Sequence, residues 1–107
     1  MSALKVNTDS FDLEVLKCSS PVIVDFWASW CRPCMILSPI IDDIADELAE
    51  KIKITKLDIE ENPSISKQYK ISSIPTLILF KDGQIVGTMM PGGSSKSDIT
   101  KWILSLV

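Results

Sequence analysis

The hydrophobic pattern of the chain switches between short β-rich runs and stretches in which apolar residues recur every three or four positions. Residues 22–27 read Val-Ile-Val-Asp-Phe-Trp, a run without alternation that is typical of a central strand buried on both faces. From Cys31 to Leu48 the apolar positions have helical spacing, which predicts a long helix beginning at or just after the cysteine pair. Pro39 lies within this stretch and is expected to kink the helix.

Other segments carry weaker strand signals. Residues 4–6 alternate briefly between apolar and polar side chains, and residues 52–59 are strand-like. Residues 77–80 and 84–90 indicate an antiparallel hairpin with its turn at Lys81-Asp82-Gly83. We therefore expect five strands, the last two joined directly.

Three shorter helices are expected from capping residues and apolar spacing. Thr8 or Ser10 is predicted to cap the first, Asn62-Pro63 to begin the second, and Ser94 or Ser95 to cap the last. The apolar positions expected to face the core are Phe11, Val15, Leu16, Ile65, Tyr69, Ile99, Trp102, Ile103 and Leu106. The resulting order, βαβαβαββα, predicts an α/β fold in which helices cover a mixed sheet.

Length and composition narrow the class of protein. The 107 residues suit a single domain spanning 1–107, and 46% hydrophobic with 23% charged residues is close to the average of globular proteins. The net charge of −3 and the lack of any Lys/Arg run argue against a nucleic-acid partner. Apolar runs stay far below the roughly 20 residues that cross a bilayer, and the first five residues lead into no signal-peptide apolar region. We expect a cytoplasmic monomer without a membrane partner.

The chain contains no histidine and three cysteines. The missing histidine excludes Ser-His and Cys-His nucleophilic catalysis, histidine-ligated metals and a histidine pH switch. Three cysteines are too few for the disulfide framework of a small secreted domain. Cys18 is expected to be a small, partly buried residue after the first helix. The remaining two, Cys31 and Cys34, stand out by their spacing.

The sequence Trp30-Cys31-Arg32-Pro33-Cys34 lies at the junction between the buried strand and the long helix. Two cysteines separated by two residues at a helix start can close a small ring, with one cysteine exposed and the other a turn further in. The unpaired N–H groups and the positive end of the helix dipole stabilise a thiolate on Cys31, which is therefore the better nucleophile. This arrangement favours reversible redox chemistry.

Other uses of the cysteine pair fit less well. A zinc site needs about four nitrogen or sulfur ligands, and the chain offers only one further cysteine and no histidine. An iron–sulfur cluster would have to bridge two subunits, and a purely structural disulfide would close too short a loop to stabilise much. We therefore expect no metal and no cofactor.

The sequence resembles the thioredoxin family along essentially its whole length. The resemblance is carried by residues 24–34, Pro39, Lys56-Leu57-Asp58, Ile74-Pro75-Thr76 and Phe80-Lys81-Asp82-Gly83. It implies a thioredoxin fold, with a central mixed five-stranded sheet flanked by four helices. It also implies a protein-disulfide reductase and electron carrier, which cycles between dithiol and disulfide through a mixed-disulfide intermediate.

The resemblance assigns roles to four residues. It implies that Cys31 attacks the substrate disulfide and that Cys34 resolves the mixed disulfide. Asp25 interrupts an apolar run, where a carboxylate is costly unless it is paired or protonated; the pattern alone leaves open that it faces solvent at a strand edge. The resemblance favours a buried Asp25 that accepts the Cys34 proton, with Lys56 close by. The alternative for Lys56 is an ordinary solvated lysine on a strand.

A substrate groove is also implied around the cysteine pair. Trp30 would form an exposed platform, Arg32 and Pro33 lie within the motif, and the backbone of Ile74 would pair with an extended substrate beside a cis Pro75. Gly92 or Gly93 would supply the remaining wall of the groove. From the residues alone, an aromatic residue such as Trp30 is more often part of the core, Pro33 fits a plain helix start equally well, and Pro75 is more often an ordinary trans proline.

Two departures from the family pattern concern specificity. Arg32 stands where the family usually has glycine, and Met90-Pro91-Gly92-Gly93 replaces the usual Val-Gly-Ala.

The implied partners are disulfide-containing protein substrates and a thioredoxin reductase as electron donor. Two alternatives stay open: an oxidase or isomerase, if Arg32 makes the disulfide strongly oxidising, and a non-catalytic module that uses the same groove to hold a partner.

Overall fold

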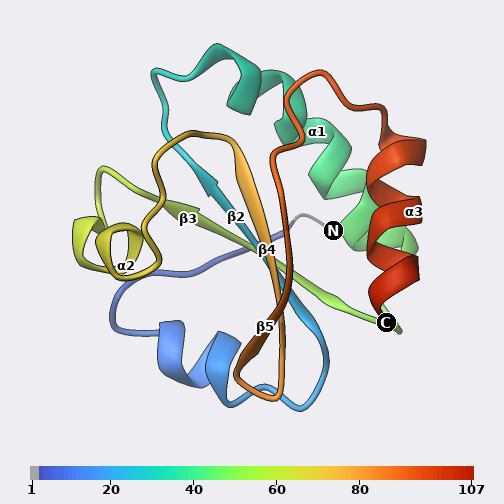
Figure 1. Ribbon diagram of the computed structural model, residues 1–107, viewed down its shortest axis with the longest axis horizontal. Helices are drawn as coiled ribbons and strands as arrows, with labels where there is room; N and C mark the ends of the chain where they lie inside the picture. Colours follow the sequence, from blue (N-terminus) through green and yellow to red (C-terminus); the bar gives the residue numbers. More distant parts are fainter. Residues whose placement is uncertain (1–2) are drawn as a thin grey trace.

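A five-stranded mixed sheet runs through the centre of the computed structural model, which describes residues 3–107 (Figure 1). The strands are β1 (Leu4–Lys5), β2 (Val22–Trp27), β3 (Lys53–Asp58), β4 (Thr76–Lys81) and β5 (Gln84–Met89), in the order β1-β3-β2-β4-β5. The first three strands are mutually parallel, whereas β4 is antiparallel to both β2 and β5. The predicted mixed sheet and the central position of β2 are confirmed.

Four helical segments cover the two faces of the sheet. They are η1 (Asp12–Leu16), α1 (Arg32–Glu47), α2 (Pro63–Gln68) and α3 (Lys96–Leu106). Helices α1 and α3 pack on one face, while η1 and α2 pack on the other, as Figure 1 shows. Strand β2 contributes Ile23 to the first core and Val24 and Phe26 to the second, because neighbouring strand residues point to opposite faces. This alternation fixes which side chains reach the cysteine pair.

The starts of two helices differ from the predictions. The side chains of Thr8 and Ser10 do not cap η1, which begins after Phe11; the Ser10 hydroxyl instead accepts from the Asn7 N–H at 3.0 Å. Asn62 is the residue before α2, as predicted, but its amide oxygen accepts from the Thr8 N–H at 2.8 Å rather than from the helix. Its partner lies 54 residues away, so the local sequence carries no sign of this contact.

The other turns and caps agree with the sequence. Ser95 caps α3 in a capping box with Asp98, and the hairpin turn places Asp82 and Gly83 at φ 52° and 77°. Helix α1 begins at Arg32, within the cysteine motif, and contains Pro39; the kink there stays a prediction. None of the helices formed by residues 3–107 has the length and apolar content needed to cross a membrane.

Candidate active site

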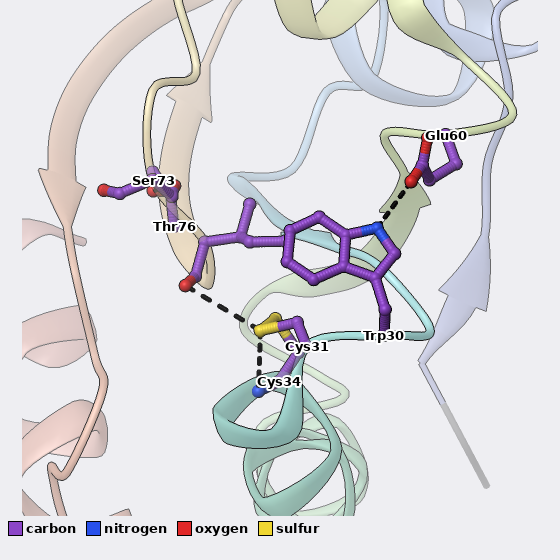
Figure 2. Close-up of a disulfide and its surroundings, with 7 residues drawn as sticks. Trp30, Cys31, Cys34, Glu60, Ser73 and Thr76 are labelled. Atoms are coloured by element: carbon purple, nitrogen blue, oxygen red, sulfur yellow. Dashed lines mark hydrogen bonds between the residues drawn. A yellow bond between two sulfur atoms is a disulfide. The ribbon is translucent and has the colours of Figure 1, made fainter.

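The cysteine pair lies at the start of α1, after the short loop that follows β2. Cys31 occupies the N-cap position of α1 and forms a disulfide with Cys34, with the two Cα atoms 5.3 Å apart. The backbone N–H of Cys34 donates to Cys31 Sγ at 3.2 Å (Figure 2). One of the otherwise unpaired N–H groups of the first helical turn therefore points at the sulfur. The helix start thus provides a donor for a Cys31 thiolate, as the sequence predicts.

The sequence predicts one exposed and one inner cysteine, but both are buried. Cys31 is 5% exposed and Cys34 is 2% exposed, because Ile59 and Ile74 pack against the pair together with Ala28. The difference between the two sulfurs lies in their surroundings rather than in their overall burial. Cys31 faces the loop that precedes β4, whereas Cys34 borders an internal cavity.

The loop before β4 lies directly opposite Cys31. The Ile74–Pro75 bond is cis, so the trans alternative for Pro75 is wrong. Cys31 Sγ lies 3.8 Å from the carbonyl oxygen of Ile74. The hydroxyl of Thr76 donates to the Ser73 carbonyl at 2.6 Å, which ties the two ends of this loop together. The loop therefore presents its backbone at the edge of the disulfide.

Trp30 lies on the surface rather than in the core. Its side chain is 65% exposed, and its indole Nε1–H donates to Glu60 Oε1 at 2.5 Å (Figure 2). Beside it is a hollow of about 240 Å³, bounded also by Ile59, Ile71 and Ile74. Sequence reasoning missed Glu60, which lies 30 residues from Trp30 in a loop that carries no motif.

Asp25 is buried in the central strand, which excludes the alternative of a solvent-facing residue at a strand edge. It is 2% exposed, and its Oδ1 has no hydrogen-bond partner among the described residues. Burial raises the pKa of Asp25 from 3.8 to about 7; the positive charge of Lys56 lowers this pKa and the negative charge of Asp42 raises it. Asp25 is therefore a carboxyl group that exchanges a proton near neutral pH.

Lys56 is opposite Asp25 in the register of β2 and β3 and is mostly buried, so it is not an ordinary solvated lysine. Its ammonium donates to the Ser38 hydroxyl at 2.5 Å and pairs with Asp42 Oδ1 at 3.3 Å. Both partners lie on α1, and Cys34, Ser38 and Asp42 follow one another at intervals of four residues, which places them on one face of the helix. This four-residue spacing is the signal that sequence reasoning overlooked.

A small cavity brings these groups together. It has a volume of about 70 Å³ and is lined by Asp25, Trp27, Cys34, Met35, Ser38 and Lys56. The indole N–H of Trp27, like Asp25 Oδ1, has no hydrogen-bond partner among the described residues. A cavity of this size with polar groups on its wall has room for water. Cys34 and Asp25 thus line the same small cavity.

We call the surface beside Cys31 and the Ile74–Pro75 loop the opening. The remaining predicted site residues lie on α1 and in the segment after β5. Arg32 and Pro33 are exposed on the first turn of α1. Apart from its two neighbours in sequence, no residue between 3 and 107 lies within 4 Å of where a Gly92 side chain would begin. Met90 is exposed, and its sulfur accepts from the Ser73 hydroxyl at 3.4 Å. Over residues 3–107, no cluster of Cys, Asp or Glu side chains has the makeup of a metal site.

A cysteine pair at a helix start, facing a cis-proline loop on a sheet of this topology, defines the class of thiol-disulfide oxidoreductases. The sequence matches the thioredoxin family over residues 2–105. It is 48% identical to "Thioredoxin" of Acidithiobacillus ferridurans, covering 94% of this chain and 92% of the relative. It is also 48% identical to "Thioredoxin" of Rickettsia bellii, covering 94% and 95%, and 50% identical to "Thioredoxin 1" of Synechococcus elongatus, covering 84% and 85%.

The chain belongs to the thioredoxin family. It is a protein-disulfide reductase whose redox-active pair is Cys31 and Cys34.

Proposed function

We propose that the two cysteines divide the reaction, with Cys31 as the attacking thiol and Cys34 as the resolving thiol. The observation that carries this proposal is the difference between their surroundings. Cys31 Sγ accepts an N–H bond from the helix start and faces the Ile74 carbonyl at the opening, whereas Cys34 borders the enclosed cavity. A thiolate stabilised at the opening is suited to attack a disulfide of another protein.

The proposed cycle moves two electrons from the dithiol to the substrate. The Cys31 thiolate attacks one sulfur of the substrate disulfide, that S–S bond breaks, and the other substrate sulfur leaves as a thiolate that takes a proton from water. Cys34 then loses its proton and attacks Cys31 Sγ. The mixed disulfide breaks, the second substrate sulfur leaves as a thiolate that takes a proton from water, and the Cys31–Cys34 disulfide remains.

Asp25 is the proposed acceptor of the Cys34 proton. The shared cavity and an Asp25 pKa of about 7 support this role, because a base works best when its pKa is near the working pH. Lys56 is proposed as a positioning residue, held by Ser38 and Asp42. The positive charge of Lys56 keeps the pKa of Asp25 from rising further.

The substrate is proposed to bind as an extended segment across the opening. The backbone of Ile74 next to the cis Pro75 would pair with it by strand addition, while Trp30 and Gly92 form the flanking walls. The exposure of Trp30 supports this arrangement, since a large aromatic side chain held at the surface offers apolar contact area. Arg32 and Pro33 would contact the substrate from the first turn of α1.

The reaction requires an electron donor. Each cycle ends in a disulfide, so a donor must return two electrons; we propose a thioredoxin reductase in this role. We also propose that residues 1–107 act as one domain and as a monomer in the cytoplasm. Fractionation of cells that produce the protein, followed by immunodetection, tests the location.

Trapping of the mixed disulfide tests the division of roles. Cys34→Ser is expected to accumulate mixed disulfides with substrate proteins through Cys31, because the resolving thiol is missing. Cys31→Ser is the matched control and should trap much less. Adding Cys18→Ser to Cys34→Ser should leave the trapped complexes unchanged; their loss, or mapping of the trapped sulfur to Cys18, would contradict the proposal.

A further inference from the structure

An apolar hollow adjoins the redox pair on the α1 side of the opening. Its volume is about 200 Å³, and it lies between the first half of α1 and the segment that joins β5 to α3. The lining residues are Pro33, Ile36, Leu37, Ile40, Pro91, Gly93 and Ser94. It is separate from the hollow beside Trp30, with which it shares no lining residue.

The chemistry of the wall selects an uncharged occupant. No charged side chain lines the hollow, and Ser94 supplies its only side-chain hydroxyl among the lining residues. Pockets for drug-sized ligands measure about 300–1,000 Å³, so this hollow is too small for such a ligand and suits a single large side chain. Gly93 has φ 80°, and among the described residues none but its sequence neighbours comes within 4 Å of where its side chain would begin, so this part of the wall carries no side chain.

The position of the hollow ties it to the redox reaction. Pro33 lies between the two cysteines in the sequence and is also part of the wall, so the hollow adjoins the redox motif. Ile36, two residues after Cys34 in α1, is 61% exposed. Met90 is exposed and directly precedes Pro91. Its sulfur accepts a hydrogen bond from the Ser73 hydroxyl, in the loop that faces Cys31. Through Pro33 the hollow therefore borders the motif whose sulfurs meet the substrate disulfide.

We propose that this hollow is a subsite for a large aliphatic side chain, such as leucine, close to the reacting cysteine of the substrate. The proposal rests on the proposed function and names its preferred substrate class: disulfide-bonded segments with a large apolar residue next to the cysteine. Burial of such a side chain removes apolar area from water on both partners and speeds the capture of the substrate by Cys31. Ile36 and Ser94 are then specificity-determining residues.

Matched peptide disulfides test the subsite. Short Gly-rich peptides with one cysteine, protected as a mixed disulfide with thionitrobenzoate, carry leucine, serine or aspartate at each of the two positions on either side of the cysteine. Attack by the dithiol protein on the peptide sulfur releases coloured thionitrobenzoate, which gives the second-order rate constant. The leucine peptide is expected to react about tenfold faster than the serine peptide at the favoured position, with the aspartate peptide slowest.

Two variants should remove this preference without touching the redox pair. Ile36→Ser opens the wall and Ser94→Leu fills the hollow; each is expected to lower the leucine-to-serine rate ratio to about two. Leu13→Ser is the matched control, because Leu13 is 68% exposed on η1 and does not line the hollow. It should keep the full ratio. Because the ratio is measured within one protein, a general loss of activity does not imitate the expected result.

Several results would overturn the subsite. These are equal rates for the leucine and serine peptides in the unchanged protein, and a ratio that persists in both Ile36→Ser and Ser94→Leu. Sedimentation that shows a dimer at the assay concentration, dissociated by Ile36→Ser, would assign the hollow to a second copy instead. If no peptide releases thionitrobenzoate, the proposed function itself is wrong and the subsite falls with it, whereas release without selectivity rejects the subsite alone.

Discussion

The buried carboxyl group of Asp25 makes the stability of this protein depend on pH in a direction opposite to that of most acidic residues. Burial raises the pKa of Asp25 to about 7, whereas in the unfolded chain it is close to 3.8. Between these two values the folded protein holds a proton that the unfolded chain has released. The free energy of unfolding therefore falls as pH rises from about 4 to about 7. Above pH 7 the stabilisation that came from the proton on Asp25 is lost completely.

The size of this effect follows from the two pKa values. A difference of about three pKa units corresponds to about 4 kcal/mol of unfolding free energy. This is a large fraction of the 5–15 kcal/mol typical of small domains. Asp25→Asn replaces the carboxyl with a neutral group of nearly the same shape. It should therefore stabilise the oxidised protein by roughly this amount at pH 8 and by little at pH 4.

Urea denaturation followed by circular dichroism measures this prediction. The unchanged protein, Asp25→Asn and the control Asp9→Asn, which alters an exposed carboxylate, are each unfolded at several pH values between 4 and 8. The difference between Asp25→Asn and the unchanged protein should grow steadily with pH, while Asp9→Asn follows the unchanged protein. A constant difference across this range would mean that Asp25 is ionised in the folded state and would refute the reasoning.

Three further changes have defined outcomes. Lys56→Gln should raise the pKa of Asp25 further, because it removes the charge that lowers it; NMR titration of the carboxyl carbon measures this, and an unchanged pKa would contradict it. Ser95→Ala should lower the free energy of unfolding by about 1 kcal/mol through loss of the α3 capping box, whereas Ser97→Ala should not. Arg32→Gly should make the reduction potential more negative, more so at low salt; equilibration with glutathione measures it, and an unchanged potential would point to partner recognition.

The elements that the sequence predicts best are those whose signal is local. The run at 22–27 lacks alternation because both of its faces are covered, and the structure places it in the middle of the sheet. The capping box at Ser95 and the positive φ values at Asp82 and Gly83 likewise depend on neighbouring residues alone. The order of the helices and strands could be predicted because a few neighbouring residues are enough to identify each of them.

The contacts that the sequence does not predict join distant segments. The Asn62 amide has several possible partners, and the tertiary structure directs its oxygen to the Thr8 N–H, 54 residues away, rather than to a helix end. The bond between Trp30 and Glu60 exists only because the loop after β3 passes beside the start of α1. Such pairings require the fold before they can be recognised.

The placement of Asp25 shows how one strand serves both the core and the chemistry. In β2, Asp25 points to the same face as Ile23, which packs against α1 and α3, while Val24 and Phe26 point to the other face. A shift of β2 by one residue would turn Asp25 away from Cys34 and toward the η1 side of the sheet. The packing of apolar residues on both faces opposes such a shift, because each side chain of β2 would move to the opposite face and no longer fit its neighbours in the core. The packing that buries Asp25 at a cost to stability is therefore the same packing that holds its carboxyl group beside the cavity of the resolving cysteine.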